Sequence, residues 1–139
     1  MTIGLLLGPY NVPNYRAVGH YRLTNKTPAA TYRAPGRFEG TFVRERLIEA
    51  IATRLQLDPL EVRRRNLITS AQMPYERGLS ALETEVILDS GDYEGLIDKT
   101  LAWAKWDELQ REAAERRAAG EAVGIGFGIF VEKSGLGPS

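Results

Sequence analysis

Two arginines in the stretch Asn25–Glu45 are the side chains of this sequence best suited to bind an anion. Arg33 and Arg37 flank a turn made by Pro35 and Gly36. A guanidinium group offers fork-like pairs of N–H donors to phosphate or carboxylate oxygens. The turn leads into a predicted helix, and the free N–H groups at a helix N-terminus also favour an anion. The sequence therefore predicts an anion-binding loop; the alternative is that both arginines form ordinary ion pairs.

Other kinds of reactive site find little support in the composition. The 139 residues include no cysteine and one histidine, His20. These counts exclude disulfides, thiolate metal sites and a cysteine nucleophile in this chain, and they argue against a histidine-rich metal site or a catalytic triad. The sequence has no metal-ligand cluster, nucleophile elbow or P-loop. His20 alternates with arginines, which predicts a surface histidine.

The overall charge and hydropathy are those of an ordinary globular domain. Lys and Arg number 18 and Asp and Glu number 18, while 43% of residues are hydrophobic. A net charge of zero gives no general attraction to nucleic acid or to an anionic membrane. The short apolar run Leu5–Leu7 stops at Gly8-Pro9 and has no basic residues before it, so it predicts neither a signal peptide nor a membrane span. We expect one cytoplasmic domain with no nucleic-acid or membrane partner.

The elements on either side of the loop are predicted from periodicity. Alternation over Tyr15–Thr24 predicts a strand, and Ala29–Arg33 predicts a shorter one. A helix is predicted from Phe38 or Glu39 to Gln56, where Gly40 could allow a close approach by a neighbouring segment or ligand. The residues expected on its apolar face are Phe42, Val43, Leu47, Ile48, Ile51, Ala52 and Leu55. Those expected on its exposed side are Arg44, Glu45, Glu49, Thr53 and Arg54.

A second helix, Leu60–Leu67, is predicted from the capping pair Asp58-Pro59. It contains three consecutive arginines, Arg63–Arg65, which cannot share one face because neighbouring residues are about 100° apart. A basic patch for nucleic acid is one interpretation. Without interleaved aromatic residues, we expect instead that at least one arginine folds inward onto a carboxylate or backbone carbonyls.

The second half of the sequence predicts short strands and two further helices, which gives an α+β fold class overall. Irregular sequence precedes a strand at Thr84–Leu88, and Ser90-Gly91-Asp92 caps a helix at Tyr93–Ala104. Asp107 caps an exposed helix at Glu108–Ala119, with Gly120 in the C′ position. Val123–Glu132 is the clearest predicted strand. Its glycines all point one way, so we expect something to pack closely there; they are Gly124, Gly126 and Gly128.

Several motifs occur together and in order along the chain. In that order they resemble the molybdenum-binding large subunit of the xanthine dehydrogenase/aldehyde oxidase/carbon monoxide dehydrogenase family, most of all its bacterial aldehyde-oxidase-like and carbon-monoxide-dehydrogenase-like branch. The motifs are Gly8-Pro9-Tyr10-Asn11-Val12-Pro13-Asn14, Thr24-Asn25-Lys26-Thr27-Pro28, Thr31-Tyr32-Arg33-Ala34-Pro35-Gly36-Arg37, Glu45-Arg46-Leu47-Ile48, Asp58-Pro59-Leu60-Glu61-Val62-Arg63-Arg64-Arg65-Asn66-Leu67 and Asp89-Ser90-Gly91-Asp92-Tyr93.

The resemblance implies a molybdopterin cofactor, usually in its cytosine dinucleotide form in bacteria, that oxidises an electrophilic carbon of a small-molecule substrate. It also implies iron–sulfur and FAD partner subunits, which carry electrons away through [2Fe–2S] clusters to FAD. By this match Tyr32, Arg33 and Ala34 line the cofactor site, with Arg33 nearest the substrate or metal ligands. Gly36 and Arg37, together with Pro35, are expected to hold the shape of the loop.

Two departures from the family limit what the resemblance implies. Carbon monoxide dehydrogenases have a cysteine where this chain has Ala34, so their copper-containing mechanism is not expected; other relatives commonly have glycine there. The family's catalytic glutamate would lie beyond Ser139, so no catalytic residue is expected in this chain. We therefore expect residues 1–139 to be a partial domain that needs the remainder of the large subunit and is inactive alone. The alternative is a non-catalytic binding or structural module that retains the fold.

Overall fold

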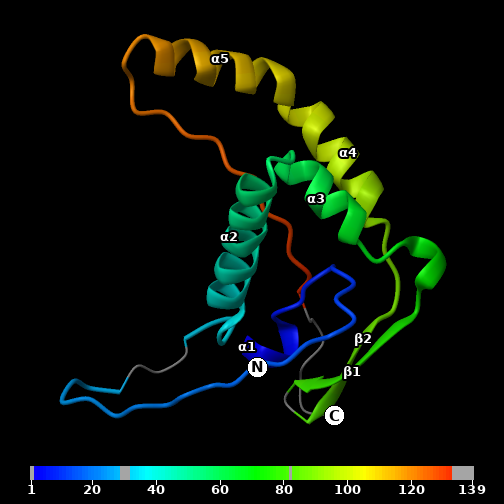
Figure 1. Cartoon of the computed structure of the whole chain (residues 1–139). Coiled ribbons are helices and arrows are strands. Elements are labelled where there is room, and N and C mark those ends of the chain that lie inside the picture. Colours follow the sequence, from blue (N-terminus) through cyan, green and yellow to red (C-terminus); the bar gives the residue numbers. More distant parts are fainter. Residues whose placement is uncertain (1, 29–31, 82, 133–139) are drawn as a thin grey trace.

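The computed structural model describes residues 2–28, 32–81 and 83–132. Helices and a two-stranded antiparallel sheet together confirm the α+β class (Figure 1). The α-helices are α1 (Thr2–Leu5), α2 (Arg37–Leu55), α3 (Pro59–Asn66), α4 (Tyr93–Ala104) and α5 (Trp106–Ala118), and a 3₁₀ turn covers Ser70–Gln72. The strands are β1 (Tyr75–Ala81) and β2 (Thr84–Leu88).

The hydrophobic core lies where four parts of the chain meet. Leu60 of α3 and Ile97 of α4 pack there with Ile129 from the C-terminal segment. Tyr10 and Leu67 complete the cluster and form an isolated antiparallel bridge with each other. This bridge fixes the N-terminal turn against the end of α3, and α2 stands between α3 and α1 (Figure 1).

Two of the three predicted helix caps are confirmed, whereas the cap predicted at Asp107 is wrong, because Asp107 lies inside α5 and no side chain caps that helix at its N-cap residue Lys105. The Asp58 carboxylate accepts the Glu61 backbone N–H at 3.2 Å, and the Asp92 carboxylate accepts that of Gly95 at 2.9 Å. These bonds satisfy donors that have no partner inside the helix, which is why the chain turns into α3 and α4 at these points. Helix α5 begins at Trp106, two residues before the predicted start, and projects away from the core with only Ala113 buried (Figure 1).

The predicted faces of α2 are right at Ala52, Thr53 and Arg54 but wrong over much of the helix. Arg44 and Glu45 are buried, with 8% and 7% exposure, whereas Val43, Leu47 and Ile51 are 46%, 56% and 47% exposed. The buried side of α2 faces charged and hydroxyl groups, so an arginine and a glutamate with partners can lie there. The apolar stripe meets no comparable surface within the described chain. Helix α1 lies over Gly40, but an added Cβ there would make only an ordinary 3.6 Å contact with Thr2 Cγ2, so the packing does not require glycine.

Two predicted strands lack a partner strand, and one real strand was missed. Tyr15–Thr24 and Val123–Glu132 belong to no sheet among the described residues, whereas β1 pairs with β2 through Tyr75↔Leu88 and Ala81↔Thr84. Alternation predicts the two faces of an extended segment but says nothing of a partner, which a strand needs. The short strand predicted at Ala29–Arg33 falls partly outside the described residues, and the chain bends at 32–34.

Candidate functional site

The loop that leads into α2 contains two left-handed residues. Ala34 has φ 46° and Gly36 has φ 72°, and the Arg37 N–H donates to the Ala34 carbonyl at 2.9 Å across the turn between them. Glycine reaches this region freely, whereas alanine does so at a cost of about 1–2 kcal/mol. The loop therefore carries backbone strain at Ala34, beside the arginine expected to face a ligand.

Both the dihedral angle and the surroundings of residue 36 require glycine at this position. A Cβ added at Gly36 would overlap the Thr2 hydroxyl of α1. No side chain caps α2 at this glycine. The Arg37 and Gly40 N–H groups bond to the carbonyls of Ala34 and Gly36, whereas those of Phe38 and Glu39 bond to no described carbonyl and keep their capacity to bind an acceptor. This arrangement favours an anion at the loop.

The two loop arginines take different roles. Arg37 forms an ion pair with Glu132 of the C-terminal segment, so the ion-pair interpretation holds for this residue. Arg33 is exposed and forms no hydrogen bond or ion pair with the rest of the described chain. Tyr32, its neighbour, is 94% exposed. The structure thus anchors one end of the loop and leaves Tyr32 and Arg33 facing outward.

Behind the loop lies a buried cluster made by Tyr10, Arg44, Glu45 and Arg63, which we call the Glu45 cluster. The Glu45 carboxylate accepts the Nε–H groups of Arg44 and Arg63, each at 3.0 Å, and the Tyr10 hydroxyl at 3.2 Å. Arg63 has no exposed surface and also pairs with Glu49 at 2.9 Å. The expectation that one of the three consecutive arginines folds inward is confirmed by Arg63.

The Glu45 cluster changes the acidity of its members. Burial, reinforced by the charge of Glu45, raises the pKa of the Tyr10 hydroxyl above its ordinary value. Burial lowers the pKa of Arg63, but its hydrogen bonds and charge pairing with Glu45 outweigh that effect and leave the pKa raised. The hydroxyl therefore stays protonated and the guanidinium charged, which keeps the cluster intact.

The same cluster holds the C-terminal segment in place. Arg63 Nη2 donates to the Phe127 carbonyl at 2.9 Å, and Arg44 Nη2 donates to the Ile129 carbonyl at 2.7 Å. The sequence analysis missed Tyr10, Arg44 and Glu45 as buried groups. A signal was present, because Gly40 and Ala52 share a helical face with Arg44 and Glu45, and small residues mark a side that another element approaches closely.

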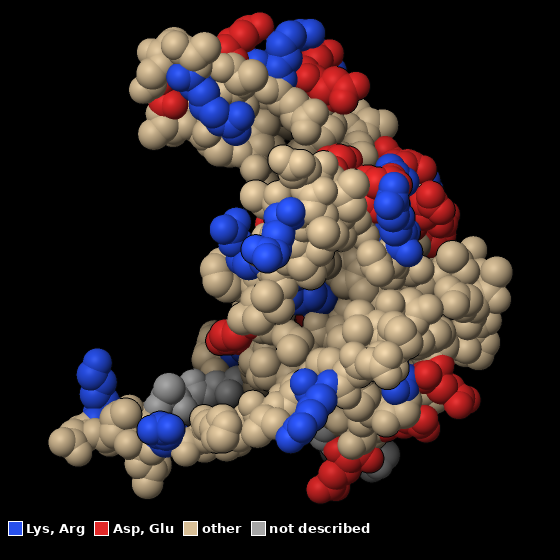
Figure 2. Space-filling model, in the orientation of Figure 1, with Lys and Arg blue, Asp and Glu red and all other residues tan. Residues whose placement is uncertain are grey.

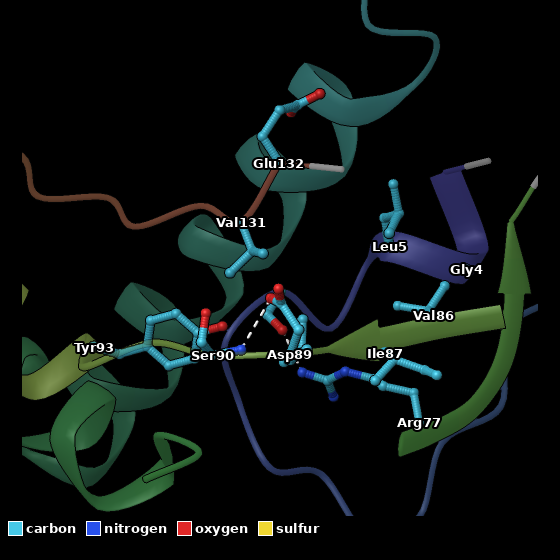
Figure 3. A pocket seen from close by; sticks show the side chains of 12 residues that line it. Gly4, Leu5, Arg77, Val86, Ile87, Asp89, Ser90, Tyr93, Val131 and Glu132 are labelled. Atoms are coloured by element: carbon cyan, nitrogen blue, oxygen red, sulfur yellow. Dashed lines mark hydrogen bonds between the residues drawn. The ribbon is translucent and has the colours of Figure 1, made fainter. Parts of the chain in front are cut away.

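A cavity of about 360 Å³ lies next to the anchor of the loop. Figure 3 shows Val131 and Glu132 on one side and Arg77 with Ile87 of the sheet on another. The Arg77 guanidinium donates to the carbonyls of Gly8 and Tyr10, and burial lowers its pKa. Its donors are thus engaged with backbone, so we assign no ligand to this cavity.

Other kinds of site receive no support from the part of the chain that the structure describes. No three His, Asp or Glu side chains are grouped so as to hold a metal there. Every helix in the described ranges is too short or too polar to span a bilayer. Lys and Arg are scattered over the face in Figure 2 and do not form one basic patch. His20 is exposed, as predicted.

Comparison with known proteins gives consistent matches along the chain. Residues 1–67 match the family described as molybdopterin cofactor-binding domain. The 6-hydroxypseudooxynicotine dehydrogenase complex subunit gamma of Paenarthrobacter nicotinovorans is 42% identical over 137 residues, which cover 99% of this chain and 17% of the relative. The carbon monoxide dehydrogenase large chain of Hydrogenophaga pseudoflava is 32% identical, with 95% of this chain and 16% of the relative covered.

A solved structure agrees with these relatives. Reconstituted CO dehydrogenase from Oligotropha carboxidovorans matches with a TM-score of 0.50 and 29% identity, over 59% of this chain and 10% of that one. The chain spans about a sixth of the length of the curated relatives that it matches. The motifs, the domain match and the fold thus agree: the chain belongs to the xanthine dehydrogenase/aldehyde oxidase/carbon monoxide dehydrogenase family and is a segment of its molybdopterin-binding large subunit.

Proposed function

We propose that this chain forms one wall of the molybdopterin site in the large subunit of a molybdenum hydroxylase. The observation that carries the proposal is the contrast between the two loop arginines. Arg37 is anchored to Glu132, while Arg33 is exposed and has no partner among the described residues. An arginine with a free fork of donors, next to an uncapped helix, suits an anionic ligand.

The residues of the loop fit such a cofactor. Arg33 would bind its anionic oxygens, with Tyr32 and Ala34 beside it, while Gly36 and Arg37 keep the loop in shape. When bound, the cofactor supplies a redox-active metal that oxidises an electrophilic carbon of a small molecule. This chain's contribution is to orient and hold a charged group and to exclude water on one side. The base and the remaining walls would come from the rest of the large subunit.

The finer assignments belong to the same proposal. They are the cytosine dinucleotide form of molybdopterin, iron–sulfur and FAD subunits as partners, and a cytoplasmic location. The names of the relatives support further subunits, since one is a subunit gamma of a dehydrogenase complex and another is a nicotine 6-hydroxylase large subunit. The substrate of this chain's own enzyme follows from neither name.

The test compares Arg33→Ala with Arg64→Ala in the complete large subunit. Arg64 is the matched control, because its guanidinium pairs with Glu94 and Asp98 on α4, far from the loop. We expect Arg33→Ala to lower turnover at least about tenfold and to reduce bound molybdenum, with the melting temperature nearly unchanged. Arg64→Ala should show the reverse order of effects. Unchanged turnover and metal content in Arg33→Ala, with lower stability, would contradict the proposal.

The isolated chain offers a second test. Because it would supply only one wall, we expect the purified 139 residues to bind no molybdenum cofactor tightly and to oxidise no aldehyde in a dye-linked assay. Stoichiometric molybdenum in the isolated chain would overturn this expectation. Co-purification of iron, flavin and other subunits with the chain would support the enzyme assignment over a non-catalytic module.

A further inference from the structure

Three glycines on one face of the C-terminal segment have no structural reason within the part of the chain that the structure describes. Residues 123–132 run extended, with Val123, Ile125, Phe127, Ile129 and Val131 turned inward and the glycines outward. A Cβ added at Gly124 or Gly126 would meet no described atom within 4 Å, and one at Gly128 would make an ordinary 3.6 Å contact with Glu45 Cγ. None of the three has a left-handed φ. Neither a turn nor a close neighbour within the described chain therefore requires glycine.

Glycine at such positions is unfavourable unless something else approaches. In an extended strand glycine destabilises the folded state relative to alanine, because a glycine loses more backbone freedom on folding. Glycine in a strand marks a place where another backbone or a bulky side chain comes close. The sequence alone predicted such a neighbour, and nothing among the described residues fills the role at Gly124 and Gly126.

The backbone of the same segment has one occupied edge and one free edge. The carbonyls of Phe127 and Ile129 accept hydrogen bonds from Arg63 and Arg44. Backbone groups two residues apart in an extended chain point to the same side, so these arginines cover that side in place of a neighbouring strand. Gly126 and Gly128 direct their N–H and C=O groups to the opposite side, where they bond to no other described residue.

We propose that a β-strand from another part of the large subunit pairs with this free edge and lays large apolar side chains over the three glycines. Residues 124–130 carry no charge, and Phe130 is 64% exposed on the glycine face, so the surface suits an apolar strand. Bulky cross-strand neighbours commonly cover glycines in this way. More than four-fifths of each curated relative lies outside the matched segment, which is ample chain to supply the strand.

This inference rests on the proposed function, because it takes the rest of a large subunit as the partner. A second copy of this chain could also add a strand at the free edge. That alternative predicts a dimer of the isolated chain, which would be broken by proline at Gly126 or Gly128. A strand of the large subunit predicts a monomer. A proline-sensitive dimer, measured by sedimentation, would overturn the proposal.

The test uses Gly124→Val and Gly126→Val in two settings. One is the 139-residue chain alone, and the other is the large subunit of the 42% identical relative carrying this chain in place of its matching segment. In the isolated chain valine should leave the melting temperature unchanged or raise it, because valine favours an extended backbone and nothing opposes its side chain. In the large subunit the same changes should lower the melting temperature and reduce folded yield several-fold.

Ala122→Val is the control, since Ala122 is exposed just before the extended segment and already carries a Cβ. It should be tolerated in both settings. Hydrogen exchange gives a second measurement: amides of 124–130 should be protected in the large subunit and exchange quickly in the isolated chain. Equal tolerance of Gly126→Val and Ala122→Val in the large subunit would overturn the inference. If the valine variants are tolerated and the large subunit still binds molybdenum, the strand proposal fails and the proposed function stands. If the variants disrupt the large subunit but that subunit binds no molybdenum even with the glycines in place, the proposed function fails and the strand proposal stands.

Discussion

Replacing Glu45 with glutamine should strongly destabilise the chain. The substitution keeps the shape of the side chain and removes its negative charge from between Arg44 and Arg63. Arg63 has no exposed surface and Arg44 only 8%, so neither guanidinium can recover its hydration without opening the core. The variant therefore leaves two buried cations facing a neutral amide.

The structure sets the size of the effect. Two opposite charges about 4 Å apart interact by about 4 kcal/mol at an effective dielectric constant of 20. Removing one partner from a buried pair typically costs about 3–5 kcal/mol. Glu49 still pairs with Arg63 at 2.9 Å, which offsets part of the loss. We expect Glu45→Gln to lower the free energy of unfolding by about 3 kcal/mol, a large share of the roughly 5–15 kcal/mol typical of a domain.

Urea unfolding of the 139-residue chain, followed by tryptophan fluorescence, measures this loss. Trp106 packs edge-to-face on Phe127 with ring centroids 6.1 Å apart, so its emission reports the segment that Arg63 holds. Glu49→Gln is the control one turn along α2. Its side chain is 30% exposed, and solvent screening should limit its effect to about 1 kcal/mol. Equal midpoint shifts for the two variants would refute the account of the Glu45 cluster.

Three smaller predictions concern the loop and the cluster. Ala34→Gly should leave the free energy of unfolding measured in urea unchanged or raise it by up to about 1 kcal/mol, because a φ of 46° strains alanine. A clear loss of stability would contradict this strain. Gly36→Ala should destabilise by about 2 kcal/mol, with partial recovery on adding Thr2→Gly, which removes the overlapping side chain. The wild type should lose stability relative to Tyr10→Phe as the pH rises above 10.0. The reason is that burial raises the pKa of Tyr10 in the folded state, so its stabilising contribution is complete below pH 10.0 and decreases above it. Parallel pH profiles of the two proteins would argue against this account.

Local signals in the sequence were enough to predict helices α2 to α5 and one strand, but not the short helix α1. The bounds of α4 and β2 match those expected, and Asp58 and Asp92 cap the helices that they were expected to cap. Capping and turn formation depend on residues within one helical turn, so the sequence contains what is needed to predict them. The loop ahead of α2 was predicted for the same reason, from Pro35, Gly36 and the helical pattern that follows.

Long-range pairing was beyond the same reasoning. The buried face of α2 depends on Arg63, eighteen residues after Glu45, and on Tyr10, which lies thirty-five residues before it. A charged residue is expected outside unless its partners are known, and spacing along one helix does not reveal partners on another. The two unpaired extended segments failed for a related reason, because alternation describes a strand's faces and not its neighbours.

The contacts described for residues 34–37 of the loop bear on what the loop can do. Thr2 packs against Gly36 and Glu132 pairs with Arg37, while Arg33 meets nothing described. These contacts hold residues 36 and 37 in place, so within the described part of the loop we expect a ligand to order chiefly the Arg33 side chain on binding. Changes at Gly36 or Glu132 should therefore weaken binding by loosening the loop and lowering stability, whereas a change at Arg33 should weaken binding with the fold intact. Arg33→Lys separates charge from geometry: if the fork of donors matters, lysine should restore little of the binding lost in Arg33→Ala.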